Sequence, residues 1–102
     1  MRVVLHPDAV AEATAAGDWY DAQRPGLGAD LADELERALD LILENPQTWP
    51  MWPGAPAALG VRRFLLPHFP FGLAYVVRGN EVVILAVAHL RRRPGYWLRR
   101  TD

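Results

Sequence analysis

The chain contains no cysteine and no lysine. The absence of cysteine excludes a disulfide framework, a thiolate metal site and a cysteine nucleophile. The three histidines share no ligand spacing on one element, so we expect no bound metal and no other cofactor. No apolar run approaches the roughly 20 residues that span a bilayer. We therefore expect a cytoplasmic protein that does not associate with membranes.

Motifs of the common enzyme classes are missing as well. The sequence shows no phosphate-binding glycine loop, no nucleophile elbow and no paired-carboxylate site. Glu34 and Glu36 are expected on a solvated helix surface, without a role in chemistry. The sequence therefore does not indicate an enzyme that depends on any of these three motifs.

What is present is one compact unit of globular composition. The chain has 102 residues, of which 51% are hydrophobic and 23% are charged. This length suffices for one domain, which we place at residues 1–102. The composition is typical of a folded protein with a sizeable core and not of a disordered one.

Charge is distributed unevenly along the chain. Residues 1–50 contain three arginines and ten acidic residues, whereas residues 51–102 contain eight arginines and two acidic residues. The net charge of −1 thus combines an acidic half with a basic half. All eleven basic residues are arginine, whose planar guanidinium binds phosphate through two parallel hydrogen bonds.

The first half predicts a short strand followed by two helices. Residues 2–6 are rich in β-branched side chains and form the strand, and Pro7 suits the first position of a helix that extends to about Tyr20. A turn is expected at residues 21–28, which contain three helix-breaking residues. The second helix ends before Pro46, and its apolar residues recur at helical spacing: Leu31, Leu35, Leu39 and Ile42.

The second half predicts a loop and three strands. The loop at residues 46–60 contains four prolines and two tryptophans. The strands are expected at residues 61–66, 71–78 and 81–88. Gly79-Asn80 predicts a tight hairpin between the last two. The order β-α-α-β-β-β indicates an α+β fold, in which an αα-hairpin covers one face of a small, mostly antiparallel sheet.

Arginines and aromatic residues are interleaved in the second half. The arginines form three groups: Arg62 and Arg63, then Arg91, Arg92 and Arg93, then Arg99 and Arg100. Guanidinium groups bind phosphate and aromatic rings stack on bases, a combination that suits RNA. The candidate nucleic-acid contacts are Arg63, Arg92, Arg93 and Trp97. A charged rim that only keeps the sheet in solution explains the same composition.

His89 is the one histidine placed where acid–base catalysis is plausible, at the end of the last strand. Histidine changes its charge near neutral pH, as a general acid or base requires. Tyr96 could donate a proton or stack on a base. The structural alternatives are a strand-end histidine that bonds only to the backbone and a tyrosine that only packs.

Four segments of the chain together resemble the RelE/ParE superfamily of bacterial type II toxins. The most specific patterns are A..WY....PGLG from Ala16, NP..WP from Asn45, VRR...P.FP from Val61 and AVAH..R.P.YW..R from Ala86. The resemblance covers nearly the whole chain. It implies a βααβββ fold and a toxin that a cognate antitoxin protein neutralises.

The resemblance implies two alternative activities. RelE-like members cleave mRNA on the ribosome, and by position His89, Arg62, Arg91 and Tyr96 match their catalytic groove. Cleavage needs a base, a proton donor and cations for the phosphorane charge. ParE-like members instead inhibit DNA gyrase and need no catalytic set. A degenerate, non-toxic interaction module is the third possibility.

Overall fold

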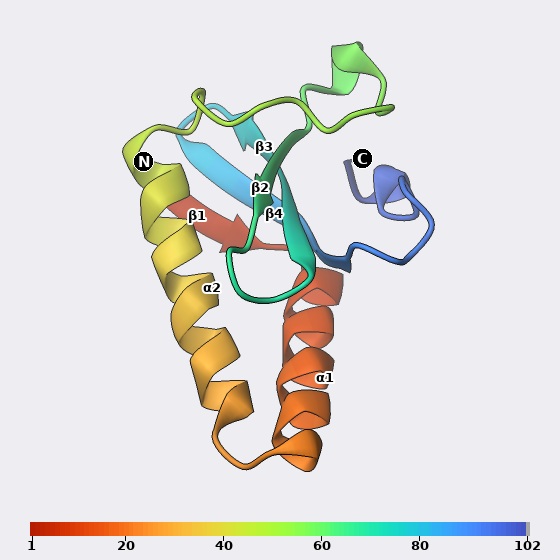
Figure 1. Cartoon of the computed structure of the whole chain (residues 1–102). Helices are drawn as coiled ribbons and strands as arrows, with labels where there is room; N and C mark the ends of the chain where they lie inside the picture. Colours follow the sequence, from red (N-terminus) through yellow and green to blue (C-terminus); the bar gives the residue numbers. More distant parts are fainter. Residues whose placement is uncertain (102) are drawn as a thin grey trace.

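The computed structural model describes residues 1–101, and its four strands form one mixed sheet in the order β1-β4-β3-β2. The terminal strand β1 pairs in parallel with β4, whereas β4 with β3 and β3 with β2 pair antiparallel. Figure 1 shows the order along the chain, which confirms the predicted β-α-α-β-β-β sequence. The elements are β1 (Arg2–Leu5), α1 (Pro7–Gln23), α2 (Leu27–Glu44), β2 (Arg62–Leu65), β3 (Phe71–Arg78) and β4 (Glu81–His89), with short 3₁₀ turns at Ala57–Leu59 and Leu98–Thr101.

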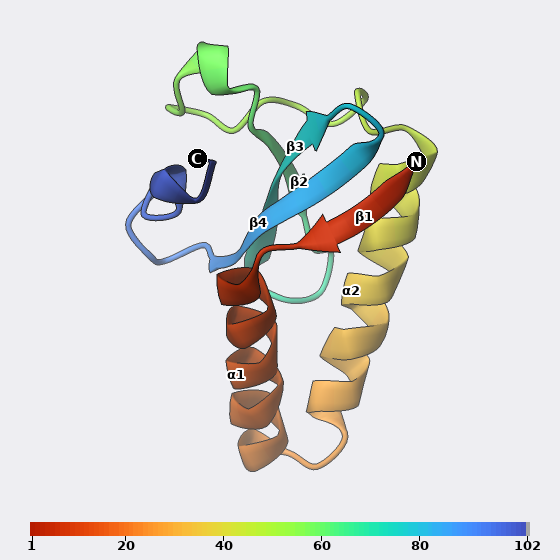
Figure 2. The same ribbon diagram turned by 180° about the vertical axis from the view of Figure 1, so that it is seen from behind.

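The sheet lies between two apolar layers. On one face, side chains such as Phe71, Leu73 and Ile84 pack with both helices, as the sequence predicts. On the other face, Leu85 and Ala88 pack with Trp97 of the C-terminal tail and with Trp52 of the loop. The helical hairpin extends away from the sheet, and its turn lies at the opposite end of the molecule from residues 46–60 (Figures 1 and 2). Neither helix is long and apolar enough to cross a membrane.

A β-bulge in β4 changes which face its last residues occupy. The register shifts between Ala74 and Tyr75 of β3, whose partners are Ala86 and Ile84, so that Leu85 has no partner. Leu85 and Ala86 consequently both face the tail, whereas Val87 returns to the helix side. Regular alternation without the bulge would place these later residues on the opposite faces.

The turn between the helices depends on two glycines. Gly26 has a φ of 97°, a left-handed conformation that glycine adopts without a steric penalty. Gly28 lies in the first turn of α2 against α1, and its amide donates a 2.7 Å hydrogen bond to the Asp21 carboxylate. A Cβ at position 28 would lie 2.7 Å from the carbonyl oxygen of Gly17. The PGLG sequence therefore permits both the chain reversal and the close helix contact.

The buried stripe of α2 differs from the predicted one. Leu35 and Leu39 are only partly buried, while Leu31 and Ile42 are nearly inaccessible, as are Glu34 and Ala38 between them. Glu34 was expected on the solvated surface, and that expectation is wrong. Its carboxylate accepts a hydrogen bond from the backbone amide of His68 and lies 2.6 Å from the imidazole Nδ1 of the same residue. This buried acid ties the β2–β3 connection to α2.

We predict that Gly28→Ala destabilises the fold by about 1–3 kcal/mol, because the new methyl group would overlap backbone that cannot move freely. Gly17→Ala is the matched control in the same helix pair. A Cβ there meets nothing within 4 Å, so the change should stabilise α1 by about 0.5–1 kcal/mol. Urea unfolding gives the free energy of unfolding of each variant. Equal changes in this free energy for Gly28→Ala and Gly17→Ala would contradict the close contact between the helices at Gly28.

The Glu34–His68 pair predicts a pH dependence of stability. Burial alone would raise the pKa of Glu34, but hydrogen bonds from His68 and the charges of His68 and Arg37 lower it below its ordinary value of 4.5. A lowered pKa stabilises the fold above the unfolded value, and this contribution is lost as the pH falls through the folded value. Wild type should therefore exceed Glu34→Gln in unfolding free energy at pH 7. The difference should shrink in acid below about pH 4, and a constant difference would contradict the assignment.

Candidate functional site

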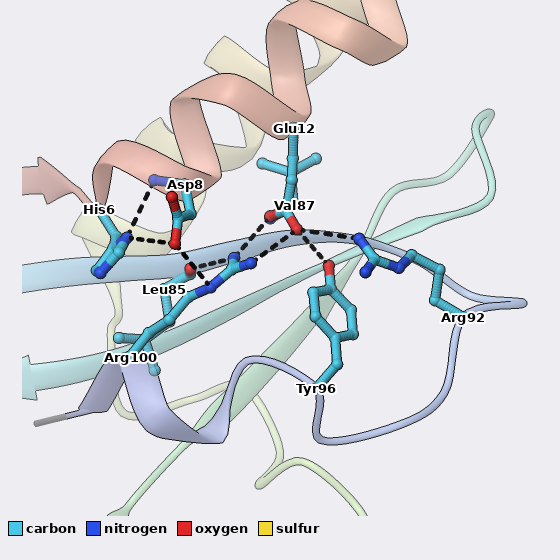
Figure 3. A network of polar contacts seen from close by, with 8 residues as sticks. All are labelled: His6, Asp8, Glu12, Leu85, Val87, Arg92, Tyr96 and Arg100. Atoms are coloured by element: carbon cyan, nitrogen blue, oxygen red, sulfur yellow. Dashed lines mark hydrogen bonds and ion pairs between the residues drawn. The ribbon is translucent and has the colours of Figure 1, made fainter.

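The Glu12 carboxylate on α1 accepts hydrogen bonds from the C-terminal tail and from β4. Tyr96 donates its hydroxyl at 2.6 Å, and Arg100 donates two guanidinium bonds at 2.9 and 3.2 Å. The guanidinium of Arg92 lies 3.5 Å away, and the amide of Val87 donates at 3.0 Å. Figure 3 shows these groups converging on the one carboxylate, which is largely buried. Glu12 therefore joins three parts of the chain.

Glu12 and Arg100 also complete the open edge of β4. The neighbouring strand β1 is paired only as far as Ile84, whose carbonyl accepts the amide of His6 at 2.9 Å. Figure 2 shows that β4 continues beyond the end of β1. Past this point, the carbonyl of Leu85 accepts a hydrogen bond from Arg100, and the amide of Val87 donates to Glu12. Two side chains thus take the place of a missing strand, because unpaired buried backbone groups are costly.

The groups around Glu12 shift one another's ionisation. Burial raises the pKa of Tyr96, and the hydrogen bond to Glu12 raises it further. Burial disfavours the charged form of Arg100, but its hydrogen bonds and attraction to Glu12 outweigh this effect and raise its pKa. Tyr96 also has the guanidinium of Arg92 3.7 Å from its ring centroid. The phenol is therefore neutral and fixed inside a structural network.

Trp97 is not available as a nucleic-acid contact in this conformation, contrary to the sequence-based expectation. Its side chain is fully buried on the tail face of the sheet. The indole packs edge-on against Trp52 with 5.1 Å between ring centroids. Stacking on a base requires an open ring face, and the packed core removes it. Trp97 holds the tail against the sheet.

His89 faces the helical hairpin because of the bulge in β4. It pairs with Phe71 across the strands, and the two rings pack edge-to-face at 5.2 Å. Together with Ala16, Trp19 and Tyr20 of α1, these rings line a cavity of about 280 Å³. The backbone amide of Arg91 donates to the imidazole Nδ1 at 3.1 Å, so the neutral ring carries its proton on Nε2. His89 therefore has an apolar, aromatic environment.

The two arginines of β2 lie on opposite faces of the sheet. Arg62 bonds to the carbonyl of Trp49 at 2.7 Å and to the side chain of Gln47 at 2.9 Å. Arg63 places its guanidinium 5.8 Å from the ring centroid of Trp52 on the tail side. Both guanidinium groups thus support the loop at residues 46–60.

The predicted catalytic residues have different neighbours in the structure. The cross-strand partners of His89 and Arg62 are Phe71 and Tyr75, which lie roughly 13 Å apart along β3 at about 3.3 Å per residue. The Tyr96 hydroxyl bonds to Glu12 of α1, whereas His89 lies in the cavity beside Ala16, one turn further along the same helix. Arg91 contacts His89 through its backbone amide. Arg92 packs on Tyr96, and Arg93 is exposed.

Sequence analysis missed Glu12 and Arg100, the two residues with the most side-chain contacts in this region. They are 88 positions apart, and no local motif connects them. The one available signal was the charge split between the two halves, which does not say which acid meets which arginine. Within residues 1–101, no group of three or more His, Asp or Glu side chains is placed to hold a metal ion.

We predict that Glu12→Ala and Arg100→Ala each destabilise the fold by about 2–3 kcal/mol. This is somewhat less than the ~3–5 kcal/mol of a fully buried pair, because both side chains keep slight contact with solvent. The double variant should show a coupling energy of about 1–3 kcal/mol. Urea unfolding of the four proteins gives this value, and Glu36→Ala, an exposed change, should cost under about 0.5 kcal/mol. Strict additivity would contradict the network.

Comparison with known proteins agrees with this architecture. The family model described as "ParE toxin of type II toxin-antitoxin system, parDE" matches residues 3–94. Among solved structures, the "Chromosomal ParDE TA system from P. aeruginosa" superposes with a TM-score of 0.78 at 22% sequence identity. That match covers 89% of this chain and 97% of the other and shows a shared fold. No curated protein is significantly similar in sequence.

The family match spans nearly all of the chain, from β1 to the turn that follows β4. It includes the helical hairpin, the whole sheet and Glu12. A toxin of this kind is paired with a cognate antitoxin, which is the partner that the sequence led us to expect. The chain belongs to the ParE family of toxins from type II toxin–antitoxin systems.

Proposed function

We propose that the chain arrests growth as an inhibitor of DNA gyrase that acts by binding and not by catalysis. The proposal is one of the two activities that the sequence resemblance implies. Membership in the ParE family favours it over ribosome-dependent mRNA cleavage. The arrangement of the candidate catalytic side chains favours it as well.

The observation that carries the proposal is the hydrogen bond between the Tyr96 hydroxyl and the Glu12 carboxylate. Its hydroxyl donates to Glu12 at 2.6 Å, and its pKa is raised by burial and by that hydrogen bond. A general acid must release its proton to the leaving group in the transition state, which a phenol held by a buried carboxylate does poorly. Arg62 was predicted to stabilise the negative charge of the phosphorane. Its guanidinium likewise already donates hydrogen bonds to the carbonyl of Trp49 and the side chain of Gln47.

His89 would then be the only free acid–base group of the predicted set. RNA cleavage needs one group to accept the proton of the 2′-hydroxyl and another to donate a proton to the leaving oxygen. These two atoms are separated in space, so a single imidazole cannot serve both. The cavity beside His89 is lined by Ala16 and by the rings of Trp19, Tyr20 and Phe71, with no arginine in the lining. This cavity suits an apolar or aromatic side chain of a protein partner better than an RNA backbone. Binding a protein target fits these residues without any catalytic step.

Induction of the toxin in a heterologous bacterium tests the proposed function. Gyrase inhibition should induce the DNA-damage response and leave early protein synthesis intact. Co-expression of the cognate antitoxin should restore growth. Immediate translation arrest with cleaved mRNA would overturn the proposal in favour of the nuclease, and normal growth with soluble toxin would support the non-toxic module.

We predict that His89→Ala remains toxic when its expression is matched to wild type. The imidazole has no catalytic task under this proposal but lines the cavity assigned to the target, so purified His89→Ala should inhibit gyrase supercoiling within about tenfold of wild type. General acid–base assistance is worth about 10²–10⁴-fold, so loss of that assistance would be unmistakable. Circular dichroism checks the fold of the variant. A folded His89→Ala that no longer stops growth, beside a toxic wild type, would contradict the non-catalytic mechanism.

A further inference from the structure

The Glu12 network divides the five tail arginines into two sets. Arg100 turns inward to Glu12, and Arg92, whose side chain is 54% exposed, lies over the ring of Tyr96 with its guanidinium 3.5 Å from Glu12. The other three, Arg91, Arg93 and Arg99, are exposed, and none of them makes an ion pair within the part of the chain that the structure describes. No acidic residue occurs between positions 82 and 101. These three arginines therefore belong to a positively charged tail segment.

The tail presents these arginines on a fixed backbone. Trp97 is fully buried, and Arg100 bonds to both Glu12 and the carbonyl of Leu85. Backbone hydrogen bonds join the amide of Leu98 to Gly95 and the amide of Arg100 to Trp97. A ligand that binds here would not have to order the backbone first, which lowers the entropic cost of binding.

The same network removes the aromatic groups of the tail from the surface. Trp97 lies in the core, and the hydroxyl of Tyr96 bonds to Glu12 while Arg92 covers its ring. Recognition of single-stranded RNA or DNA relies on bases that stack on open aromatic rings. Without open aromatic rings, the exposed arginines retain phosphate binding as their main contribution, and phosphate contacts carry no sequence information. This composition favours the backbone of a duplex.

We propose that Arg91, Arg93 and Arg99 bind the phosphate backbone of duplex DNA without sequence preference. The contact goes beyond the proposed gyrase inhibition and does not depend on it. If gyrase is the target, the duplex that the enzyme holds would be within reach of a toxin bound beside it. The tail would then add a salt-dependent contact to the protein–protein one.

Fluorescence anisotropy with a labelled 20-base-pair duplex of mixed sequence tests the proposal. Three phosphate contacts predict a slope of about −2.7 for log K against log [NaCl]. Raising NaCl from 50 to 200 mM should therefore weaken the binding of wild type roughly 40-fold. Arg91→Gln/Arg93→Gln/Arg99→Gln should bind at least about tenfold more weakly at 50 mM NaCl, with a slope near zero.

The matched control removes the same charge elsewhere. Arg2, Arg24 and Arg37 are the three arginines of the acidic half, and all three are exposed. The triple variant Arg2→Gln/Arg24→Gln/Arg37→Gln should keep the affinity and slope of wild type. Equal losses in the two triple variants would show that only net charge matters and would overturn the proposal.

Two further outcomes would overturn it. One is the absence of duplex binding by wild type at 50 mM NaCl. The other is tighter binding to a single-stranded RNA of the same length, which would indicate base stacking that the tail does not offer. Gyrase supercoiling is assayed separately, so a toxin that binds the duplex but leaves gyrase active would refute the proposed function alone.

Discussion

The carboxylate of Glu12 is the interaction on which the C-terminal half of the structure depends. Strand β4 is longer than its neighbour β1, so part of its edge has no partner strand. Glu12 accepts the amide of Val87, and Arg100 donates to the carbonyl of Leu85. The ion pair between Glu12 and Arg100 couples this edge to the tail. Glu12 and Arg100 together thus satisfy the edge and fix the tail, which carries half of the exposed arginines.

This arrangement separates the structural residues of the tail from those that are free to bind. Within the R.P.YW..R pattern, by which the ending resembles the toxin superfamily, Tyr96, Trp97 and Arg100 pack on Glu12, on one another or on the sheet. Arg92 of the pattern is about half exposed and lies over the ring of Tyr96. The arginines outside the pattern are exposed. The pattern therefore marks how the tail is held. In our two proposals, target binding involves the cavity beside His89, and duplex binding involves the exposed arginines of the tail.

Much of the fold follows from local signals in the sequence. Pro7, the PGLG turn and the Gly79-Asn80 hairpin locate the chain reversals, and helical and strand periodicities supply the elements between them. The site could not be predicted in the same way. The bulge at Leu85 turns His89 toward the hairpin, and alternation counted along the sequence does not reveal a bulge. Glu12 meets partners about 75 to 88 positions away, and Glu34 is buried because His68 satisfies it across 34 positions.

Hydrogen exchange at the amide of Val87 tests the role of Glu12 most directly. In wild type, this amide has a buried carboxylate as its acceptor where a neighbouring strand would otherwise stand. The account predicts that the Val87 amide is protected from exchange as strongly as amides in the paired part of β4, such as that of Val82. Exposure of the Val87 amide to water requires α1 and the tail, which are joined at Glu12, to separate. Exchange at the rate of an exposed edge, many orders of magnitude faster, would contradict the account and leave the tail without its proposed support.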